Sequence, residues 1–279
     1  MQVNLLKHLE LALKRVGREP PFRMFAKELL RVLPVSARTK SEWDAAARPA
    51  YLHGVLSAAE LATAQGVPEI AVIEFGVAGG SGLLLLQEYA GMVEAETGVK
   101  IHVYGFDSGS GLPATTGDYR DHPDQWKPGD YPMDEARLRA KLAARTHLII
   151  GNIADTVAQF AQAANFPPLG FIAIDVDLYS SARDALKILT LPGRRLMQVP
   201  IYMDDTDFIF SHRFAGELLA IDEFNSENKA VKIDQWHGIA NRRAFPENSW
   251  LRKMYVAHDL VAISGTVLKR AAGQLPLHA

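Results

Sequence analysis

The chain has 279 residues, of which 48% are hydrophobic and 22% are charged, so it has ample apolar material for a folded core. A net charge of −2 gives no electrostatic reason to expect a nucleic-acid partner. The absence of cysteine excludes disulfides, thiolate catalysis and cysteine-ligated zinc. No apolar run reaches the roughly 18 residues of a membrane span, and no signal-peptide segment is recognisable. We therefore expect a cytoplasmic protein that does not enter a membrane.

The first part of the chain is predicted to be helical. Apolar residues recur at helical spacing in the stretches 6–16, 22–33 and 50–64. Gly66 suits the end of the third helix, because glycine readily adopts the left-handed conformation there. We expect residues 1–66 to form a helical N-terminal extension or cap, and residues 67–279 to form the main domain.

From residue 69 onward, predicted strands and helices alternate. Apolar runs bounded by turn residues predict strands at 70–75, 101–106, 148–150 and 171–174, and another that ends at Met203. The runs 230–236 and 253–258 are predicted to pair as a terminal antiparallel hairpin. Pro200 cannot donate to a central ladder, so we expect a bulge there or a strand that begins at Ile201. The pattern predicts an α/β protein with a doubly wound, mostly parallel seven-stranded sheet.

A glycine-rich turn follows the first of these strands. Glu74 and Phe75 end the strand, Gly76 and Gly79 lie in the turn, and Ser81 begins the next predicted helix. Glycine tolerates positive φ and lets a ligand approach the backbone, while free N–H groups at a helix start face that ligand. The spacing does not fit the dinucleotide fingerprint G-x-G-x-x-G. The turn indicates another nucleotide-type site, with an ordinary βα turn as the alternative.

The ends of four predicted strands carry acidic residues: Glu74, Asp107, Asp175 with Asp177, and Asp204 with Asp205. Ligands bind beyond the carboxyl ends of the strands in an open α/β sheet, so we expect these carboxylates around one crevice. Asp107 is placed to accept hydrogen bonds from a ribose diol, or else to cap its own loop.

The four aspartates after the last two of these strands indicate a metal site. Converging carboxylates repel one another and are forced to take up protons unless a cation lies between them. Oxygen ligands without histidine or cysteine favour Mg²⁺ or Ca²⁺ over zinc. The alternative is that these aspartates cap the following helices or lie on a solvated rim.

The sequence resembles the metal-dependent S-adenosylmethionine (SAM) O-methyltransferases of the macrocin O-methyltransferase family, class I enzymes that act on sugars and phenols of natural products. An acidic residue two positions before the first glycine, here Glu74 before Gly76, is typical of their first motif. Matching segments occur in the right order across about residues 70–225, at 74–81, 105–108, 111–113, 151–156, 174–181, 204–205 and 220–224.

The resemblance implies a Mg²⁺-dependent transfer of a methyl group from SAM to a hydroxyl of a small molecule of the sugar or phenol type. It implies that Asp177 is the general base and that Mg²⁺ is held by Asp175, Asp204 and Asp205. Glu74 and the glycine turn would hold the methionine end of SAM, Asp107 the ribose, and Asn152 with Ile153 the adenine. The full implied set of SAM contacts is Glu74, Gly76, Val77, Gly79, Ser81, Asp107, Ser108, Asn152, Ile153 and Asp175.

This chemistry is consistent with the residue types. Methyl transfer is an in-line displacement that needs a nucleophilic oxygen near attack distance. A metal lowers the pKa of an acceptor hydroxyl, and a nearby carboxylate removes its proton. Asp177, two residues after Asp175, faces the same side if the strand stays extended.

The sequence departs from the family where an acceptor pocket is expected. A longer segment beginning at Thr206 replaces the family's Tyr and short glycine-containing link, and the loop 108–132 and the N-terminal helices match only loosely. Aromatic candidates for the pocket walls are Tyr119, Trp126, Tyr131, Phe208 and Phe210, and alternative candidates for the base are His122, His212 and His237.

Two other functions stay open from the sequence. One is a non-catalytic relative that binds SAM and a metal. The other is a glycosyltransferase, because Asp175-Val176-Asp177 is a D-x-D motif, although this leaves the glycine turn unexplained. For the leading function we expect a small hydroxylated acceptor, no nucleic acid, and a homo-oligomer of two or more subunits.

Overall fold

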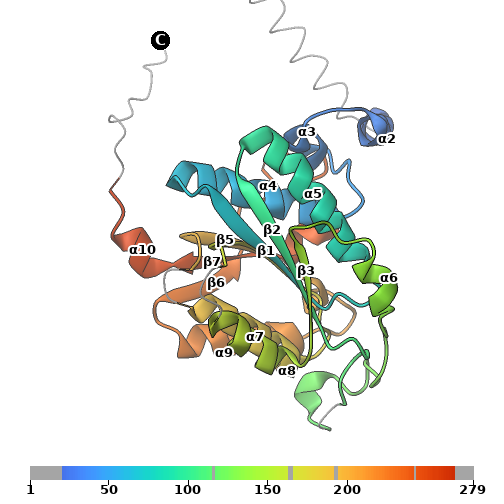
Figure 1. The fold of residues 1–279 in the computed structure, drawn as a ribbon, viewed down its shortest axis with the longest axis vertical. Helices are drawn as coiled ribbons and strands as arrows, with labels where there is room; N and C mark the ends of the chain where they lie inside the picture. The colour runs from blue at the N-terminus through green and yellow to red at the C-terminus, as the bar shows by residue number, and fades with distance from the viewer. Residues whose placement is uncertain (1–20, 115–116, 163–165, 192–193, 242, 268–279) are drawn as a thin grey trace, which may run out of the picture.

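A computed structural model of the chain describes residues 21–114, 117–162, 166–191, 194–241 and 243–267 (Figure 1). At its centre lies a seven-stranded sheet in the order β3-β2-β1-β4-β5-β7-β6. The strands are β1 (Glu69–Phe75), β2 (Lys100–Asp107), β3 (Thr146–Ile150), β4 (Leu169–Ile174), β5 (Gln198–Met203), β6 (Val231–Gln235) and β7 (Met254–Asp259). Strands β1 to β5 are parallel, and β7 is antiparallel to both of its neighbours. This order with a reversed β7 is the class I methyltransferase fold, so the predicted fold class is confirmed.

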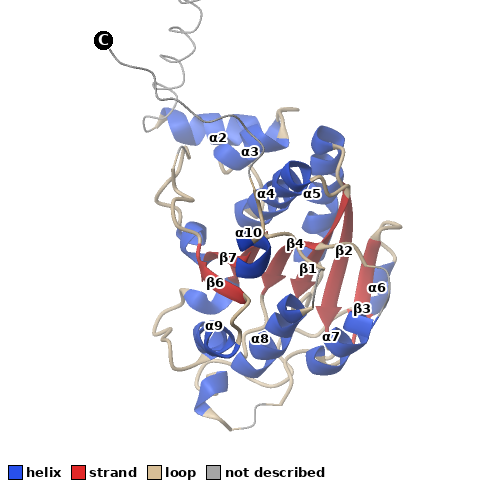
Figure 2. Cartoon of the chain, turned by 90° about the vertical axis from the view of Figure 1, so that its left-hand side faces the viewer, coloured by secondary structure: helices blue, strands red, loops and turns tan. Residues whose placement is uncertain are grey.

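Helices cover both faces of the sheet (Figure 2). Helices α4 and α5 lie on one face, and α7, α8 and α9 lie on the other. The helix bounds are α2 (Phe22–Val32), α3 (Ala37–Glu42), α4 (Pro49–Gln65), α5 (Ser81–Thr97), α6 (Glu135–Arg139), α7 (Ile153–Gln162), α8 (Tyr179–Leu186), α9 (Gly216–Glu227) and α10 (Leu260–Ser264). With both faces covered, the central strands are buried throughout, which explains the nearly continuous apolar runs of β1 and β4.

Helix α4 packs closely on the sheet. It begins with Pro49 and ends at Gly66, whose φ of 69° confirms the predicted C-terminal cap. A Cβ atom at Gly54 would lie 2.2 Å from the ring of Phe171 in β4, so only glycine allows this approach. The predicted helix at 22–33 is also present as α2, whereas the stretch 6–16 lies outside the described residues. The division of the chain at residue 66 stays a prediction.

The C-terminal strands complete the sheet as an antiparallel hairpin. The register pairs Lys232 with His258 and Ile233 with Ala257, which confirms the predicted pairing. The prediction for Pro200 was wrong, because β5 begins at Gln198 and pairs with β7 through Pro200 without a register shift. The ladder between β5 and β4 begins at Ile201. Pro200 therefore has no partner in β4, and its missing N–H breaks no hydrogen bond of that ladder.

None of the helices described in the structure combines the length and the apolar character that crossing a membrane requires.

Candidate active site

The glycine turn after β1 passes between the ends of β2 and β4. Gly76 has a φ of 84°, and its N–H donates to the carbonyl of Phe106 at 2.9 Å. A Cβ atom at Gly76 would lie 1.7 Å from the carbonyl oxygen of Asp175, so no other residue fits without moving the backbone. Gly80, with a φ of 85°, precedes the first residue of α5. The turn is therefore held in contact with the end of β4, where the aspartates begin.

Asp107, the last residue of β2, holds this turn in place. One carboxylate oxygen accepts hydrogen bonds from the N–H groups of Val77 and Ala78, at 2.9 and 2.8 Å. The other accepts from the N–H of Gly109 at 2.7 Å. The loop-capping role that the sequence left open is thus present. Asp107 also lies on the wall of the main cavity, so a contact with a ligand is compatible with this role.

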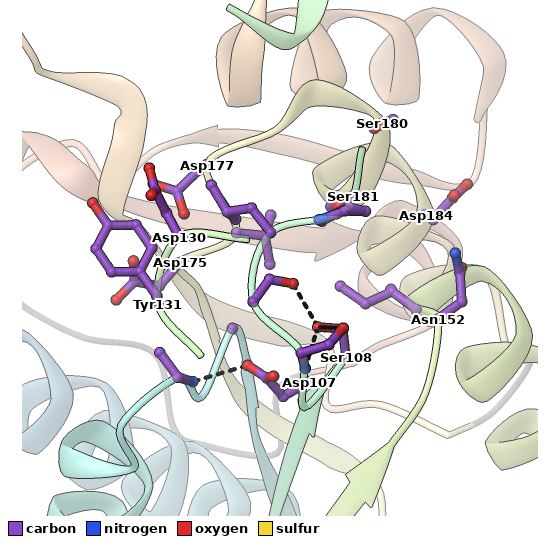
Figure 3. A pocket seen from close by; sticks show the side chains of 18 of the residues that line it. Asp107, Ser108, Asp130, Tyr131, Asn152, Asp175, Asp177, Ser180, Ser181 and Asp184 are labelled. Carbon is purple, nitrogen blue, oxygen red and sulfur yellow. Dashed lines mark hydrogen bonds between the residues drawn. The ribbon is translucent and has the colours of Figure 1, made fainter. Parts of the chain in front are cut away.

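A cavity of about 480 Å³ opens beyond the carboxyl ends of β1, β2 and β4. Figure 3 shows Asp107 and Ser108 on one side of it, and Asp130, Tyr131, Asp175 and Asp177 gathered at another. Six of the predicted SAM contacts lie on its wall: Gly76, Asp107, Ser108, Asn152, Ile153 and Asp175. The structure thus brings residues from four separate strand ends to one crevice.

The other predicted SAM contacts, Glu74, Val77, Gly79 and Ser81, are not on this wall. Val77 is buried, and its side chain fills the space beside Gly105. Glu74 is also buried and accepts a hydrogen bond from the hydroxyl of Tyr51 at 2.8 Å. Burial raises the pKa of Glu74 to about 8. The side chain of Glu74 therefore connects β1 to α4 and does not point into the cavity.

The three aspartates predicted to bind a metal do come together. One carboxylate oxygen from each of Asp175, Asp204 and Asp205 lies within 4.8 Å of the other two. Asp204 and Asp205 follow β5 directly, in a short 3₁₀ turn (Asp204–Thr206). Because β4 and β5 are adjacent and parallel, their carboxyl ends place these residues side by side.

Asp177 reaches the same cluster by a route that the sequence did not predict. Strand β4 ends at Ile174, and Asp177 has a φ of 61°, so the expected extended backbone is wrong. A left-handed turn instead brings the N–H of Asp177 to within 3.1 Å of the Oδ2 atom of Asp205. Left-handed φ is unfavourable for aspartate, and such strain is typical of functional sites.

Two other non-glycine residues with positive φ line the cavity, Ala78 in the glycine turn and Tyr131 in the loop after β2. Asp44, His122 and Phe210 also have positive φ but are not on its wall. Each such residue costs of the order of 1 kcal/mol or more, which the surrounding structure has to offset.

Two cations that were not predicted from the sequence flank the carboxylate cluster. The Nη1 atom of Arg48, just before α4, lies 3.5 Å from Asp175. The Nζ atom of Lys253, just before β7, lies 3.2 Å from Asp204. Arg48 and Lys253 are far in sequence from the aspartates that they contact, so no local sequence pattern could reveal these contacts.

Burial and mutual repulsion raise the pKa values in this cluster. Burial raises the pKa of Asp205 to about 8, and Asp177 and Asp204 add to the shift. Burial raises the pKa of Asp177 to about 7, with Asp175 as the next contribution. For Asp175 the pKa rises to about 6, through burial and Asp204, against the opposing effect of Arg48. The carboxyl groups of this cluster therefore cannot all ionise easily unless a cation neutralises part of their charge.

A buried glutamate supports the turn that carries Asp205. Glu217, at the start of α9, is fully buried, and its Oε2 atom accepts a hydrogen bond from the N–H of Asp205 at 2.9 Å. Burial raises the pKa of Glu217 well above its usual range. Glu217 was not predicted as a site residue, because an acidic residue in the first turn of a helix is favourable there for its charge alone.

The candidate histidines lie away from the cavity wall. The rings of His122 and His212 are 5.1 Å apart, and His122 packs against Phe208 at 5.2 Å. The side chain of His237 is 78% exposed and lies 3.4 Å from Asp234 on β6. Asp177, by contrast, lies on the cavity wall, and its backbone N–H donates a hydrogen bond to the carboxylate of Asp205 at 3.1 Å.

Comparisons with known proteins gave structural similarity only. No protein-family model matches the chain, and no curated protein sequence matches it. Among solved structures, the O-methyltransferase NovP has 17% identity and a TM-score of 0.49, over 75% of this chain and 79% of that one. The calicheamicin methyltransferase CalS11 has 19% identity and a TM-score of 0.49, over 79% of this chain and 90% of that one. Cofactor-bound Rv0187 from MTB has 15% identity and a TM-score of 0.39, over 91% and 95% of the two chains. No functional assignment rests on similarities of this size.

Proposed function

We propose that the protein is a SAM-dependent O-methyltransferase that uses a divalent cation and acts on a hydroxyl group of a small molecule. One observation carries the proposal: a single acidic cavity is lined by Gly76 of the glycine turn and by Asp175 and Asp177 after β4, and an oxygen of Asp175 lies within 4.8 Å of oxygens of Asp204 and Asp205 after β5. The class I methyltransferase topology is compatible with this function but does not establish it, since one fold supports many activities.

The charge of the cavity wall favours a cationic cofactor. Five carboxylates line the cavity, from Asp107, Asp130, Asp175, Asp177 and Asp184. Among the described residues of the wall there is no lysine, arginine or histidine. A positively charged sulfonium suits such a wall, whereas the pyrophosphate of a dinucleotide would be repelled. When bound, SAM would supply the electrophilic methyl group.

The donor set also fits a hard divalent cation. The three carboxylates of Asp175, Asp204 and Asp205 outnumber the two cations that contact them, Arg48 at Asp175 and Lys253 at Asp204. Oxygen-only ligands are those that Mg²⁺ prefers. When bound by Asp175, Asp204 and Asp205, the ion would supply charge neutralisation and lower the pKa of an acceptor hydroxyl.

The protein's own residues would then orient the acceptor and take its proton. Asp177 is the proposed base, because it lies on the cavity wall beside the metal ligands without belonging to the group of three. In the protein without a bound cation, burial raises the pKa of Asp177 to about 7, and a cation held by the neighbouring aspartates would lower that pKa and favour the carboxylate form that accepts a proton. Asn152 and Ile153 line the far end of the same wall, where the adenine of the cofactor is proposed to lie.

Isothermal titration calorimetry tests the cofactor. We expect SAM and its demethylated product, S-adenosylhomocysteine (SAH), to bind with a 1:1 stoichiometry. NAD⁺ should give no heat of binding, because the acidic wall repels its phosphates. Replacing Asp107 with Ala should weaken SAM binding by about 1–3 kcal/mol, because it removes a buried carboxylate that holds the turn. The same carboxylate is proposed to accept hydrogen bonds from the ribose. Binding of NAD⁺ without binding of SAM would contradict the proposal.

A further inference from the structure

Helix α2 meets the body of the protein through cationic side chains. The guanidinium of Arg23 lies 5.0 Å from the ring centre of Phe245, and the Nζ atom of Lys27 lies 5.1 Å from the same ring. The half-buried residues of this inward face are Arg23, Ala26, Lys27 and Leu30. Figure 2 shows α2 beside α3 and apart from the central sheet, so α2 covers no part of the sheet.

A second face of α2 is apolar and lies in solvent. It is formed by Phe22, Phe25, Leu29 and Val32, which are 58%, 73%, 46% and 78% exposed. No residue of α2 is buried. The helix of a globular protein normally turns its apolar face to the core and its charged face to water. Helix α2 has the reverse arrangement, and such a row of exposed apolar side chains indicates a contact surface.

The segment before α2 carries a row of apolar residues with the same spacing. Residues 1–20 lie outside the described part of the chain. In their sequence, Leu6, Leu9, Leu13 and Val16 follow one another at intervals of three, four and three residues, as do the four apolar residues of α2. This spacing favours a helix with one apolar face, of the same length as α2.

The link between the two rows suits a reversal of the chain. It consists of Gly17 to Pro21, and short links of about two to five residues join antiparallel helices in αα-hairpins. Gly17 is a favourable residue after the end of a helix, and Pro20 cannot continue one. Pro21 is the residue that precedes the first turn of α2.

The two rows match each other in an antiparallel hairpin. Because both have the same mirrored spacing, every apolar residue of one row meets an apolar residue of the other. The pairs are Val16 with Phe22, Leu13 with Phe25, Leu9 with Leu29, and Leu6 with Val32.

The size of the exposed face favours a tethered segment over a second copy of the chain. Helix α2 has 11 residues, whereas a stable interface between separate proteins takes roughly 20–30 residues from each side. A segment joined to α2 by a short link is present at an effective concentration in the millimolar range, so a small contact is enough to hold it.

We infer that residues 6–16 fold back on α2 as an antiparallel helix and cover its exposed apolar face. The resulting hairpin is docked on the body of the protein through Arg23 and Lys27. This contact is independent of the proposed methyl transfer.

Hydrogen exchange of the full chain, followed by mass spectrometry, tests whether the face is covered. We expect slow amide exchange in residues 6–16. Phe25→Asp should make that exchange at least about tenfold faster, because it places a charge in the apolar contact. The control is Met24→Asp, which makes the same substitution on α2 at a 54% exposed residue outside the apolar row. Met24→Asp should leave the exchange of residues 6–16 unchanged.

Engineered cysteines identify the segment that covers α2. The chain has no cysteine of its own, so Leu9→Cys/Leu29→Cys can form one disulfide within a copy. Mild oxidation should form that disulfide within single copies. Leu11→Cys/Leu29→Cys should react at least about tenfold more slowly, because position 11 lies roughly 200° around the helix from position 9.

Three results would overturn the inference. The first is rapid exchange of residues 6–16 in the unmodified protein. The second is slow exchange that Phe25→Asp leaves unchanged. The third is a disulfide that joins two copies, with protection that is lost on dilution, which would show that a second copy covers α2.

Discussion

Replacing Asp177 with Asn is expected to lower methyl transfer by about 10²- to 10⁴-fold, the usual contribution of a positioned general base. The amide keeps the shape of the side chain but cannot accept the proton of the acceptor hydroxyl. The backbone N–H of Asp177 donates a hydrogen bond to the Oδ2 atom of Asp205, so a change of the Asp177 side chain should leave this hydrogen bond intact. Turnover is measured with methyl-labelled SAM and a hydroxylated acceptor that the unmodified protein methylates.

Two further measurements distinguish a base from a metal ligand. Raising the pH should partly rescue Asp177→Asn, because a deprotonated acceptor no longer needs the base. The same substitution at Asp234 on β6, which is 70% exposed and pairs with His237, is a control that should keep full activity. If Asp177→Asn instead loses Mg²⁺ binding and keeps its turnover at saturating Mg²⁺, Asp177 is a ligand and the base lies elsewhere.

Removal of the metal is expected to abolish activity and to change the pH dependence of stability. The carboxyl groups of Asp175 and Asp205 have pKa values of about 6 and 8 in the folded protein, above their ordinary value of 3.8. The metal-free folded state therefore binds more protons than the unfolded chain between about pH 4 and pH 8. Its stability should fall as the pH rises through this window, since deprotonation leaves buried charges that repel one another.

Mg²⁺ should reverse this loss, and more strongly at high pH. At pH 6 the ion has to displace protons from the cluster, whereas at pH 8 most of them are already released. Thermal unfolding should show a larger Mg²⁺-induced rise in Tm at pH 8 than at pH 6. Asp204→Asn should need more Mg²⁺ for the same rise, because a neutral amide replaces a charged ligand. Full turnover of a metal-free preparation in EDTA would rule out a role of the metal in catalysis.

The sequence predicted the features that depend on local pattern. The strand ends, the glycine turn at Gly76 and the terminal hairpin follow from apolar periodicity and from the special backbone of glycine. The convergence of Asp175, Asp204 and Asp205 was also predictable, because parallel strands bring their carboxyl ends to one edge of the sheet.

Other features of the site depend on contacts that no local pattern contains. Arg48 reaches Asp175 only because α4 packs against β4, where Gly54 meets Phe171. Asp177 was expected on an extended strand, yet it lies in a left-handed turn that the contact with Asp205 stabilises. Glu74 was expected to face the cofactor, but α4 supplies Tyr51 as a buried partner on the other side. Each of these differences arises from tertiary packing, which overrides the local preference.

We propose that one cavity holds both the methyl group of SAM and the divalent cation, because Gly76 and Asp175 both line it and lie against each other. The most direct test is NMR of SAM labelled with ¹³C in its methyl group, bound to the protein with diamagnetic Mg²⁺ and then with paramagnetic Mn²⁺. We expect Mn²⁺ to broaden the methyl resonance severely, and Asp205→Asn to reduce this broadening at the same Mn²⁺ concentration. A methyl resonance of bound SAM that is the same with Mn²⁺ as with Mg²⁺, in a protein that demonstrably binds both ligands, would contradict it.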